Sequence, residues 1–224
     1  MTPSAIAWIW LVALALVMGA LIFGAAGDLR FWQGWAFLSV FFAASALITQ
    51  YLIANDPALL QRRVKGGPTA ETEPAQRLIM VFMSFGFVAL IVLPGLDHRF
   101  GWSQPPAIVA LIGDALIAVG FFVVFLVFKA NSFASSTVGV AEGQSLVSTG
   151  PYAVVRHPMY AGALIYLLGI PLALGSYWGL VAPALMTPIL IWRLVDEERV
   201  LDERLPGYSD YRRKVHYRLL PGVY

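Results

Sequence analysis

The sequence predicts an all-α integral membrane protein with about six transmembrane segments. Hydrophobic residues make up 59% of the 224 residues, and charged residues only 12%. Several uncharged runs are near 20 residues long, which is the length that a helix needs to cross a hydrocarbon core about 30 Å thick. The chain has no cysteine, which excludes disulfides, thiolate catalysis and cysteine-based metal sites.

The first four expected spans are separated by polar stretches, of which 56–77 is the longest. They lie at 5–26, 33–55, 78–96 and 106–128, and the fourth contains one acid, Asp114. An ionisable residue inside a span is costly unless it is paired or faces a polar cavity. We therefore expect Asp114 to pair with a neighbouring helix or to line an entry path, with the pairing role favoured.

The last apolar run, 159–192, is too long for one span. Its 34 uncharged residues would make a helix about 51 Å long. We expect two helices that form a hairpin, with the turn at 175–177. From Asp196 onward, charged residues and tyrosines alternate with Leu and Val, and Pro206 and Gly207 interrupt the pattern. This predicts that the last helix extends out of the bilayer and that a short helical tail folds back over the mouth.

The loop charges predict the orientation of the chain. With six spans, 13 of the 15 Lys and Arg residues fall on one side, and only Arg30 and Arg99 fall on the other. The positive-inside rule places the richer side in the cytoplasm. A multi-pass protein with both termini on the cytoplasmic side follows, and this placement explains the basic residues better than a nucleic-acid partner does.

Two polar blocks flank the predicted hairpin on that side. The first is the stretch 150–162, which reads GPYAVVRHPMYAG, and the second is 193–198, which reads RLVDEE. Charge beside a membrane usually marks a site. A plainer interpretation is that Arg156 and His157 anchor a helix end at the lipid headgroups. Similarly, Arg193 and Glu197 lie four apart and could form a helix-surface ion pair worth a few tenths of a kcal/mol.

These blocks carry a resemblance to a known family. The string at 145–152, followed by 156–162, resembles the isoprenylcysteine carboxyl methyltransferase family. Its C-terminal pattern is matched by Arg193, Glu197, Glu198, Leu201, Gly207, Tyr208, Tyr211 and Val215. The resemblance covers about residues 131–221. Related phospholipid methyltransferases and sterol-type reductases carry similar RHPxY strings, so the joint occurrence of both blocks is the more specific sign.

The resemblance implies an integral membrane enzyme that uses S-adenosylmethionine. The cofactor would lie in a cytoplasmic pocket, and a lipid-linked substrate would enter from the bilayer. Arg193 takes the place of a substrate contact, and Arg193 and Glu197 would be the catalytic residues. Gln144 stands where a histidine is frequent. The cofactor contacts implied are Thr137, Gln144, Ser145, Leu146, Val147, Tyr152, His157, Pro158, Met159, Tyr160 and Glu197.

On this basis residues 1–224 form a single membrane domain. Residues 1–129 would supply four spans, and 130–224 the cofactor-binding loop, the hairpin and the cytoplasmic tail. Pro158 suits the first position of a helix, and the free N–H groups there can receive a carboxylate or carbonyl oxygen. We expect Glu197 to hold a cationic part of the cofactor and Arg193 to clamp an acceptor carboxylate with its planar fork.

Other charged residues receive plainer expectations. We expect Asp196, Glu198 and Glu203 to be solvated or paired with Arg199 and Arg204, and we place His98 in a solvated outer loop. His216 could close the pocket or lie on the surface. Three scattered histidines without acidic partners at helical spacing argue against a metal centre.

The predicted reaction is methyl transfer to a lipophilic acceptor, with a prenylcysteine-like carboxylate as the first candidate. A carboxylate is ionised at neutral pH and needs no general base. A phospholipid amine would need deprotonation, for which Glu198 or His157 are available. A nicotinamide-dependent membrane reductase and a non-catalytic scaffold that retains the pocket stay open. No strand-borne G-x-G-x-x-G occurs, which argues against the usual soluble nucleotide fold.

Overall fold

The computed structural model describes residues 1–66, 71 and 73–223, and within these ranges it contains helices and no strand. Five helices are long and apolar enough to cross a membrane, the last together with a preceding 3₁₀ turn. These are α1 (Pro3–Ala26), α2 (Trp32–Asn55), α4 (Pro74–Phe100), α5 (Ala107–Ala130) and α7 (Val181–Arg204). The shorter elements are α3 (Pro57–Val64), η2 (Gly150–Ala153), α6 (Pro158–Ala173), η3 (Trp178–Leu180) and α8 (Tyr208–Lys214).

The predicted hairpin between 159 and 192 is confirmed. Helix α6 ends at Ala173 and the next helical turn starts at Trp178. Gly175 lies between them with φ +65°, a left-handed conformation that glycine adopts without strain. Helix α6 has only 16 residues, which corresponds to about 24 Å and is shorter than a hydrocarbon core of about 30 Å. The six apolar segments therefore form five long helices and one short one.

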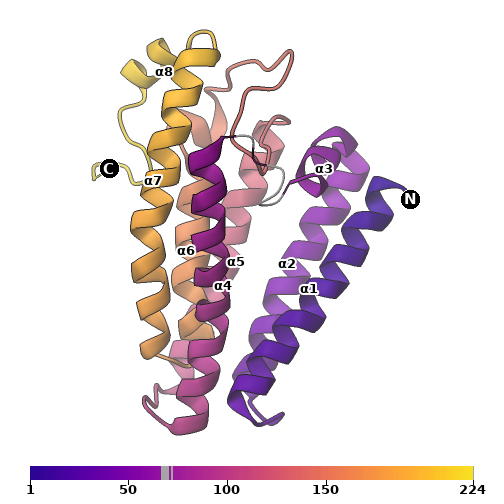
Figure 1. Cartoon of the computed structure of the whole chain (residues 1–224), viewed down its shortest axis with the longest axis vertical. Coiled ribbons are helices and arrows are strands. Elements are labelled where there is room, and N and C mark those ends of the chain that lie inside the picture. The colour runs from indigo at the N-terminus through magenta and orange to yellow at the C-terminus, as the bar shows by residue number, and fades with distance from the viewer. Residues whose placement is uncertain (67–70, 72, 224) are drawn as a thin grey trace.

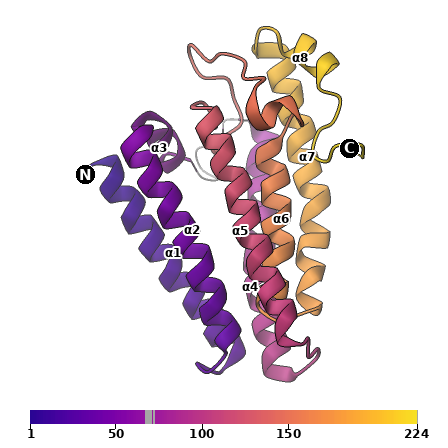
Figure 2. The ribbon, with the colours of Figure 1, turned by 180° about the vertical axis from the view of Figure 1, so that it is seen from behind.

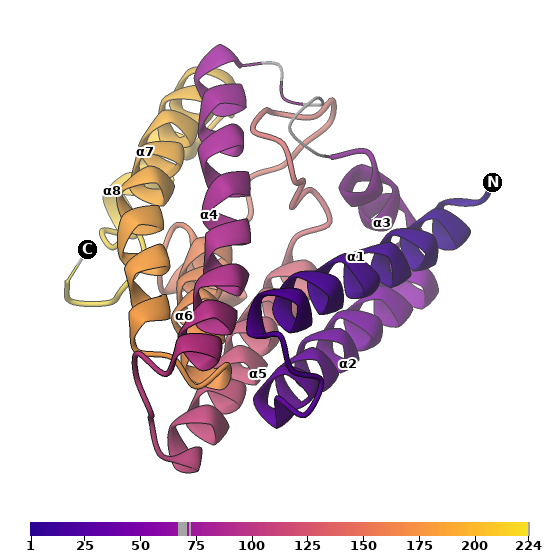
Figure 3. The ribbon, with the colours of Figure 1, turned by 60° about the horizontal axis from the view of Figure 1, so that its bottom comes forward.

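The helices divide into two groups (Figures 1 and 2). Helices α4 to α7 form a bundle, and the α1–α2 hairpin leans against it at one end and diverges from it at the other (Figure 3). The N-terminus, α3, α8 and the long loop after α5 all lie at the end where the hairpin diverges. The sidedness of this end relative to a membrane stays a prediction from the loop charges.

Helices α5 and α6 approach each other closely through glycine. A Cβ atom added to Gly113 would lie 2.0 Å from the backbone nitrogen of Ala173, and one added to Gly120 would lie 2.7 Å from the carbonyl oxygen of Gly162. A Cβ atom added to Gly169 would in turn lie 2.8 Å from the carbonyl oxygen of Gly113. Small residues at such contacts let backbones meet in a membrane, where no hydrophobic drive brings helices together. This contact fixes the start of α6, and with it the first polar block.

The opposite end is closed by a buried carboxylate. Asp97 in the last turn of α4 accepts hydrogen bonds from the Ser103 backbone N–H at 2.6 Å and from the hydroxyls of Ser103 and Ser176, both at 2.5 Å. These bonds join the α4–α5 loop to the α6–η3 turn. The expectation that His98 lies in a loop is wrong, because the helix continues past it. His98 is exposed but stacks on Phe31, with ring centroids 4.1 Å apart.

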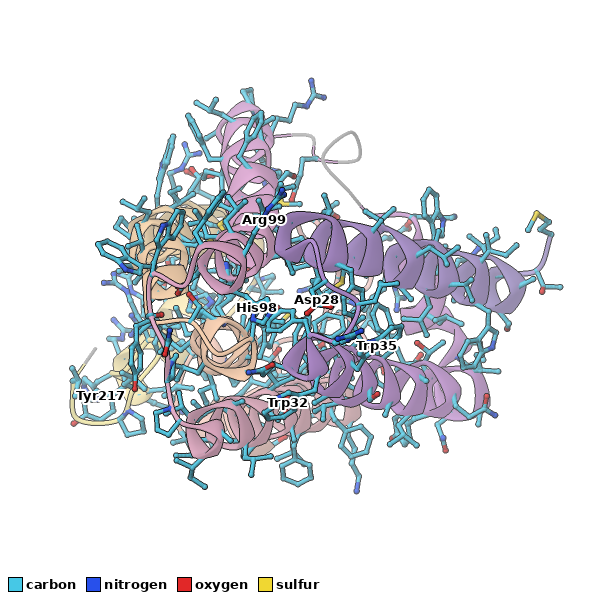
Figure 4. The ribbon with its side chains drawn as sticks, turned by 90° about the horizontal axis from the view of Figure 1, so that it is seen from below. Asp28, Trp32, Trp35, His98, Arg99 and Tyr217 are labelled. Carbon is cyan, nitrogen blue, oxygen red and sulfur yellow. The ribbon has the colours of Figure 1, made fainter. Side chains whose placement is uncertain are left out.

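Figure 4 looks onto this end, where His98 and Arg99 belong to α4 and Asp28 follows α1. The Arg99 side chain lies against Gly27, in the turn between α1 and α2. Asp114 is buried in α5, and its Oδ1 has no hydrogen-bond partner in the described part of the chain. The expected pairing of Asp114 with a neighbouring helix is therefore wrong for that oxygen.

Candidate functional site

Residues of both polar blocks line the same pocket. It lies at the end of the bundle that carries α8, between the loop after α5, the start of α6, the last turns of α7, and α8. Every residue that the resemblance implies lines it. These residues are Thr137, Gln144, Ser145, Leu146, Val147, Tyr152, His157, Pro158, Met159, Tyr160, Arg193 and Glu197.

The two blocks are joined inside the pocket by a phenol. The Tyr160 hydroxyl donates to Glu197 Oε2 at 2.5 Å, and it accepts a hydrogen bond from Arg193 Nε at 3.1 Å. Tyr160 belongs to the first turn of α6, whereas Glu197 and Arg193 lie one turn apart on α7. The hydroxyl thus bridges the cation and the carboxylate, and their relation is this bridge rather than the simple helix-surface ion pair.

Glu198 lies behind the pocket and anchors the first block. It accepts hydrogen bonds from Arg156 Nε at 2.7 Å and from Arg218 Nε at 3.0 Å, and its Oε1 lies 3.2 Å from His157 Nε2. The residue is 3% exposed. The expectation that Glu198 is solvated or paired with Arg199 or Arg204 is therefore wrong. Glu198 lies five residues after Arg193 and contacts Arg156 and His157. The spacing along the sequence does not reveal these partners.

The neighbouring acid behaves as expected, since Asp196 pairs with Arg199 at 2.8 Å. Arg204 pairs with Glu73 at 2.9 Å. His216 does not line the pocket, but its carbonyl oxygen accepts a hydrogen bond from Arg156 Nη1 at 3.0 Å. This contact ties the C-terminal segment to the first block.

Arg193 has a partner that the sequence did not reveal. Its Nη2 lies 2.9 Å from Glu71 Oε1 and 3.1 Å from the Ser136 carbonyl oxygen, and its Nη1 lies 2.8 Å from Gln76 Oε1. With the bond to Tyr160, four of its five N–H donors have protein acceptors. Glu71 is 1% exposed. It lies more than 100 residues before Arg193 in a stretch without helical periodicity, so no sequence signal connects the two.

The cover of the pocket is aromatic. Tyr208 and Tyr211 of α8 are buried and line it, and the Tyr211 hydroxyl donates to the Tyr152 carbonyl oxygen at 2.7 Å. The short helix expected in the tail is α8, which packs on the pocket, whereas its orientation relative to a membrane stays a prediction. Burial raises the pKa of Tyr152 to about 12, a shift increased by the charge of Glu197 and opposed by the hydrogen bond from Asn131. At neutral pH Tyr152 is therefore an uncharged phenol and not a base.

The pocket offers groups that suit S-adenosylmethionine. The Tyr208 hydroxyl is buried, and no hydrogen-bond partner for it occurs among the described residues. A buried hydroxyl left without a partner is costly, so this atom suits a polar ligand group. Met159 and Tyr160 follow Pro158 in the first turn of α6, where N–H groups lack an acceptor in the helix. Together with Glu197 and the tyrosine rings, these groups complement a carboxylate, an ammonium, a ribose and an adenine.

Comparison with known proteins finds a family match within the part of the chain that contains most of this pocket. Residues 108–206 match the phospholipid methyltransferase family. The segment contains all of α5 except Ala107, both polar blocks and the whole of α7. The resemblance to isoprenylcysteine carboxyl methyltransferases and related membrane methyltransferases, inferred from the two blocks, is thereby confirmed.

Parts of the chain are also similar to curated proteins, among them the following three. The protein-S-isoprenylcysteine O-methyltransferase of Schizosaccharomyces pombe is 32% identical over 76 residues, which are 31% of this chain and 30% of that protein. The mouse Delta(14)-sterol reductase TM7SF2 is 32% identical over 91 residues, 39% of this chain and 22% of its own length. The nickel-cobalt-cadmium resistance protein NccN of Alcaligenes xylosoxydans xylosoxydans is 29% identical over 108 residues, 46% of this chain and 49% of that protein. The chain thus spans less than half of each relative.

Proposed function

We propose that this protein transfers a methyl group from S-adenosylmethionine to a lipophilic acceptor at the cytoplasmic face of a membrane. The observation that carries the proposal is the meeting of both polar blocks in one pocket at the end of an apolar helix bundle. A pocket at the end of membrane-spanning helices is within reach of a molecule that stays in the bilayer. The match to the phospholipid methyltransferase family supports the same reaction.

The residues of the pocket would bind and orient rather than supply a nucleophile. Bound S-adenosylmethionine supplies an electrophilic methyl group, so the protein has to align the acceptor with it and exclude water. Glu197 would hold the ammonium, with Tyr160 fixing the direction of the carboxylate. The start of α6 would take the cofactor carboxylate, and Tyr152, Tyr208 and Tyr211 would enclose the remainder.

The acceptor that the resemblance favours is the carboxylate of a prenylcysteine-like molecule. A carboxylate is already ionised at neutral pH, so the transfer needs no base. Arg193 lines the pocket and would present its guanidinium to such an acceptor. To bind the acceptor carboxylate, Arg193 would have to use a guanidinium that already donates hydrogen bonds to groups of the protein.

A phospholipid amine is the second candidate, and a specific observation favours it. Four of the five N–H donors of Arg193 already donate to oxygens of the protein. A substrate whose reacting group is an uncharged amine does not need a hydrogen bond from Arg193. The amine has to lose a proton. Glu198 is committed to two arginines and to His157, which leaves Glu197 as the carboxylate that lines the pocket.

A nicotinamide-dependent reductase ranks behind both. The segment shared with the mouse sterol reductase is only 22% of that protein, and the matched family is one of methyltransferases. The binding experiment below separates the two cofactors directly.

The test is calorimetric titration of the detergent-purified protein with S-adenosylhomocysteine and, separately, with NADPH. We expect the wild type to bind the first and not the second. Glu197→Gln removes the charge opposite the ammonium and is expected to weaken binding about tenfold or more, because hydrogen bonds to charged groups are the stronger ones. Glu203→Gln, an exposed acid on the same helix, is the matched control and should bind like the wild type.

A labelled-methyl assay then identifies the acceptor. Prenylcysteines, phosphatidylethanolamine, fatty acids and thiols would be offered with S-adenosylmethionine. Tight NADPH binding, or binding of S-adenosylhomocysteine that is unchanged in both Glu197→Gln and His157→Ala, would contradict the proposal.

A further inference from the structure

Arg193 lines the pocket, and it is held by a carboxylate from the segment before α4. Glu71 contacts Arg193 Nη2 at 2.9 Å, and its side chain is fully buried. Its other oxygen accepts the backbone N–H of Val138 at 3.1 Å, and Val138 itself lines the pocket. Glu71 therefore binds both the cation and the loop that surrounds it.

The charges around Arg193 are balanced without any ligand. Glu71 supplies the carboxylate, and Gln76, Ser136 and Tyr160 supply neutral oxygens. Glu197 is joined to the guanidinium by hydrogen bonds through the Tyr160 hydroxyl. A ligand carboxylate beside Arg193 would thus be the third negative group around one cation, and only one N–H donor has no acceptor among the contacts given above.

We infer that Glu71 is a specificity-determining residue that competes with a ligand carboxylate for Arg193. The wild-type pocket then discriminates little between an acceptor acid and its uncharged ester. Removal of the Glu71 charge frees the fork of Arg193 for a planar, bidentate carboxylate. The inference rests on the proposed function only in taking this pocket as the acceptor site.

The experiment compares one ligand with and without its carboxylate charge. N-acetyl-S-farnesylcysteine and its methyl ester would be titrated into the protein saturated with S-adenosylhomocysteine. We expect Glu71→Gln to bind the acid about tenfold or more tightly than the wild type does, since a charge-assisted pair is restored. The ester should bind both proteins equally. Glu73→Gln is the matched control, because Glu73 stands two residues away and pairs with an exposed arginine, Arg204.

S-adenosylhomocysteine also carries a carboxylate, which could respond to the same change. The affinity of S-adenosylhomocysteine alone would therefore be measured in the wild type and in Glu71→Gln. A gain confined to this ligand would overturn the assignment to the acceptor. Equal affinity of wild type and Glu71→Gln for the farnesylated acid, or weaker binding by the variant, would overturn the inference outright.

Two further variants complete the test, and the first of them keeps it valid if Glu71→Gln folds poorly. Glu71→Asp shortens the side chain and should give a smaller gain in acid affinity. Glu71→Gln combined with Arg193→Gln removes both charges of the pair, and there the gain should vanish. A gain that persists without Arg193 would contradict the role of that guanidinium. Wild-type protein that fails to bind S-adenosylhomocysteine would instead sink the proposed function.

Discussion

Some side chains at the pocket have a polar group without a hydrogen-bond partner among the described residues, and others hold neighbouring residues in place. Tyr208 belongs to the first kind. Burial raises the pKa of its phenol, as do the charges of Glu198 and Glu197. The hydroxyl is therefore a neutral donor at physiological pH, although no acceptor for it occurs among the described residues.

Tyr208→Phe should separate binding from stability. Because the hydroxyl has no partner to lose, we expect the free energy of unfolding to stay the same or to rise slightly. Binding of S-adenosylhomocysteine should weaken by about 0.5–1.5 kcal/mol, the usual net value of a hydrogen bond. Thermal unfolding and calorimetric titration measure the two effects. Tyr211→Phe is the contrast, since it removes a bond to the Tyr152 carbonyl oxygen and should lower stability. Unchanged affinity in Tyr208→Phe would show that its hydroxyl does not contact the ligand.

Glu198 belongs to the second kind. It is buried among Arg156, His157 and Arg218, and Glu198→Ala leaves the buried guanidinium of Arg156 without its carboxylate. Breaking such a pair costs about 3–5 kcal/mol. We expect the free energy of unfolding to fall by that order and the S-adenosylhomocysteine affinity to fall with it, because the start of α6 loses its anchor. Glu203→Ala, on the exposed face of α7, should leave both quantities unchanged. A similar loss in the control would refute the assignment.

At the scale of elements, the contact between α5 and α6 decides where the first polar block lies. Gly113 and Gly120 on α5 face backbone atoms of α6 at distances that a Cβ atom cannot tolerate. Helix α6 begins at Pro158, so a shift along this contact would also move His157 and Tyr160.

Gly113→Ala should therefore push the two helices apart. Overpacking of this kind costs about 1–3 kcal/mol, and we expect a lower thermal midpoint together with weaker binding of S-adenosylhomocysteine. The matched control is Gly24→Ala on α1, where an added Cβ meets nothing within 4 Å. A midpoint equal to the wild type in Gly113→Ala would show that the helices are not held at this distance.

At the scale of the whole molecule, the basic residues and the pocket lie at one end. Of the 15 Lys and Arg residues, only Arg30 and Arg99 belong to the loops at the other end. From this distribution and the positive-inside rule we predict that the pocket faces the cytoplasm. Helix α6, at 16 residues, is the element on which the number of complete crossings depends.

The absence of cysteine makes this orientation directly testable. Gln104→Cys lies in the α4–α5 loop and Ser209→Cys in α8. We expect a membrane-impermeant maleimide to label the first in intact cells that express the protein, and the second only after lysis. Labelling of both from outside would contradict the six-segment topology.

The sequence by itself determined the long helices, the hairpin turn and many of the residues that line the pocket, but not the short helix α3. Apolar runs of membrane length report their own helices, because backbone groups in a bilayer have to pair within the segment. Both polar blocks also follow from local strings, and every residue that the resemblance implied lines the pocket.

Only the tertiary structure decided how the charges pair. Glu198 lies buried beside Arg156 and His157, and not in solvent or beside Arg199 and Arg204. Arg193 pairs with Glu71 rather than with a residue on its own helix. Partners of this kind depend on how helices distant in sequence approach one another. That approach follows from glycine contacts such as those between α5 and α6, which periodicity along one segment does not encode.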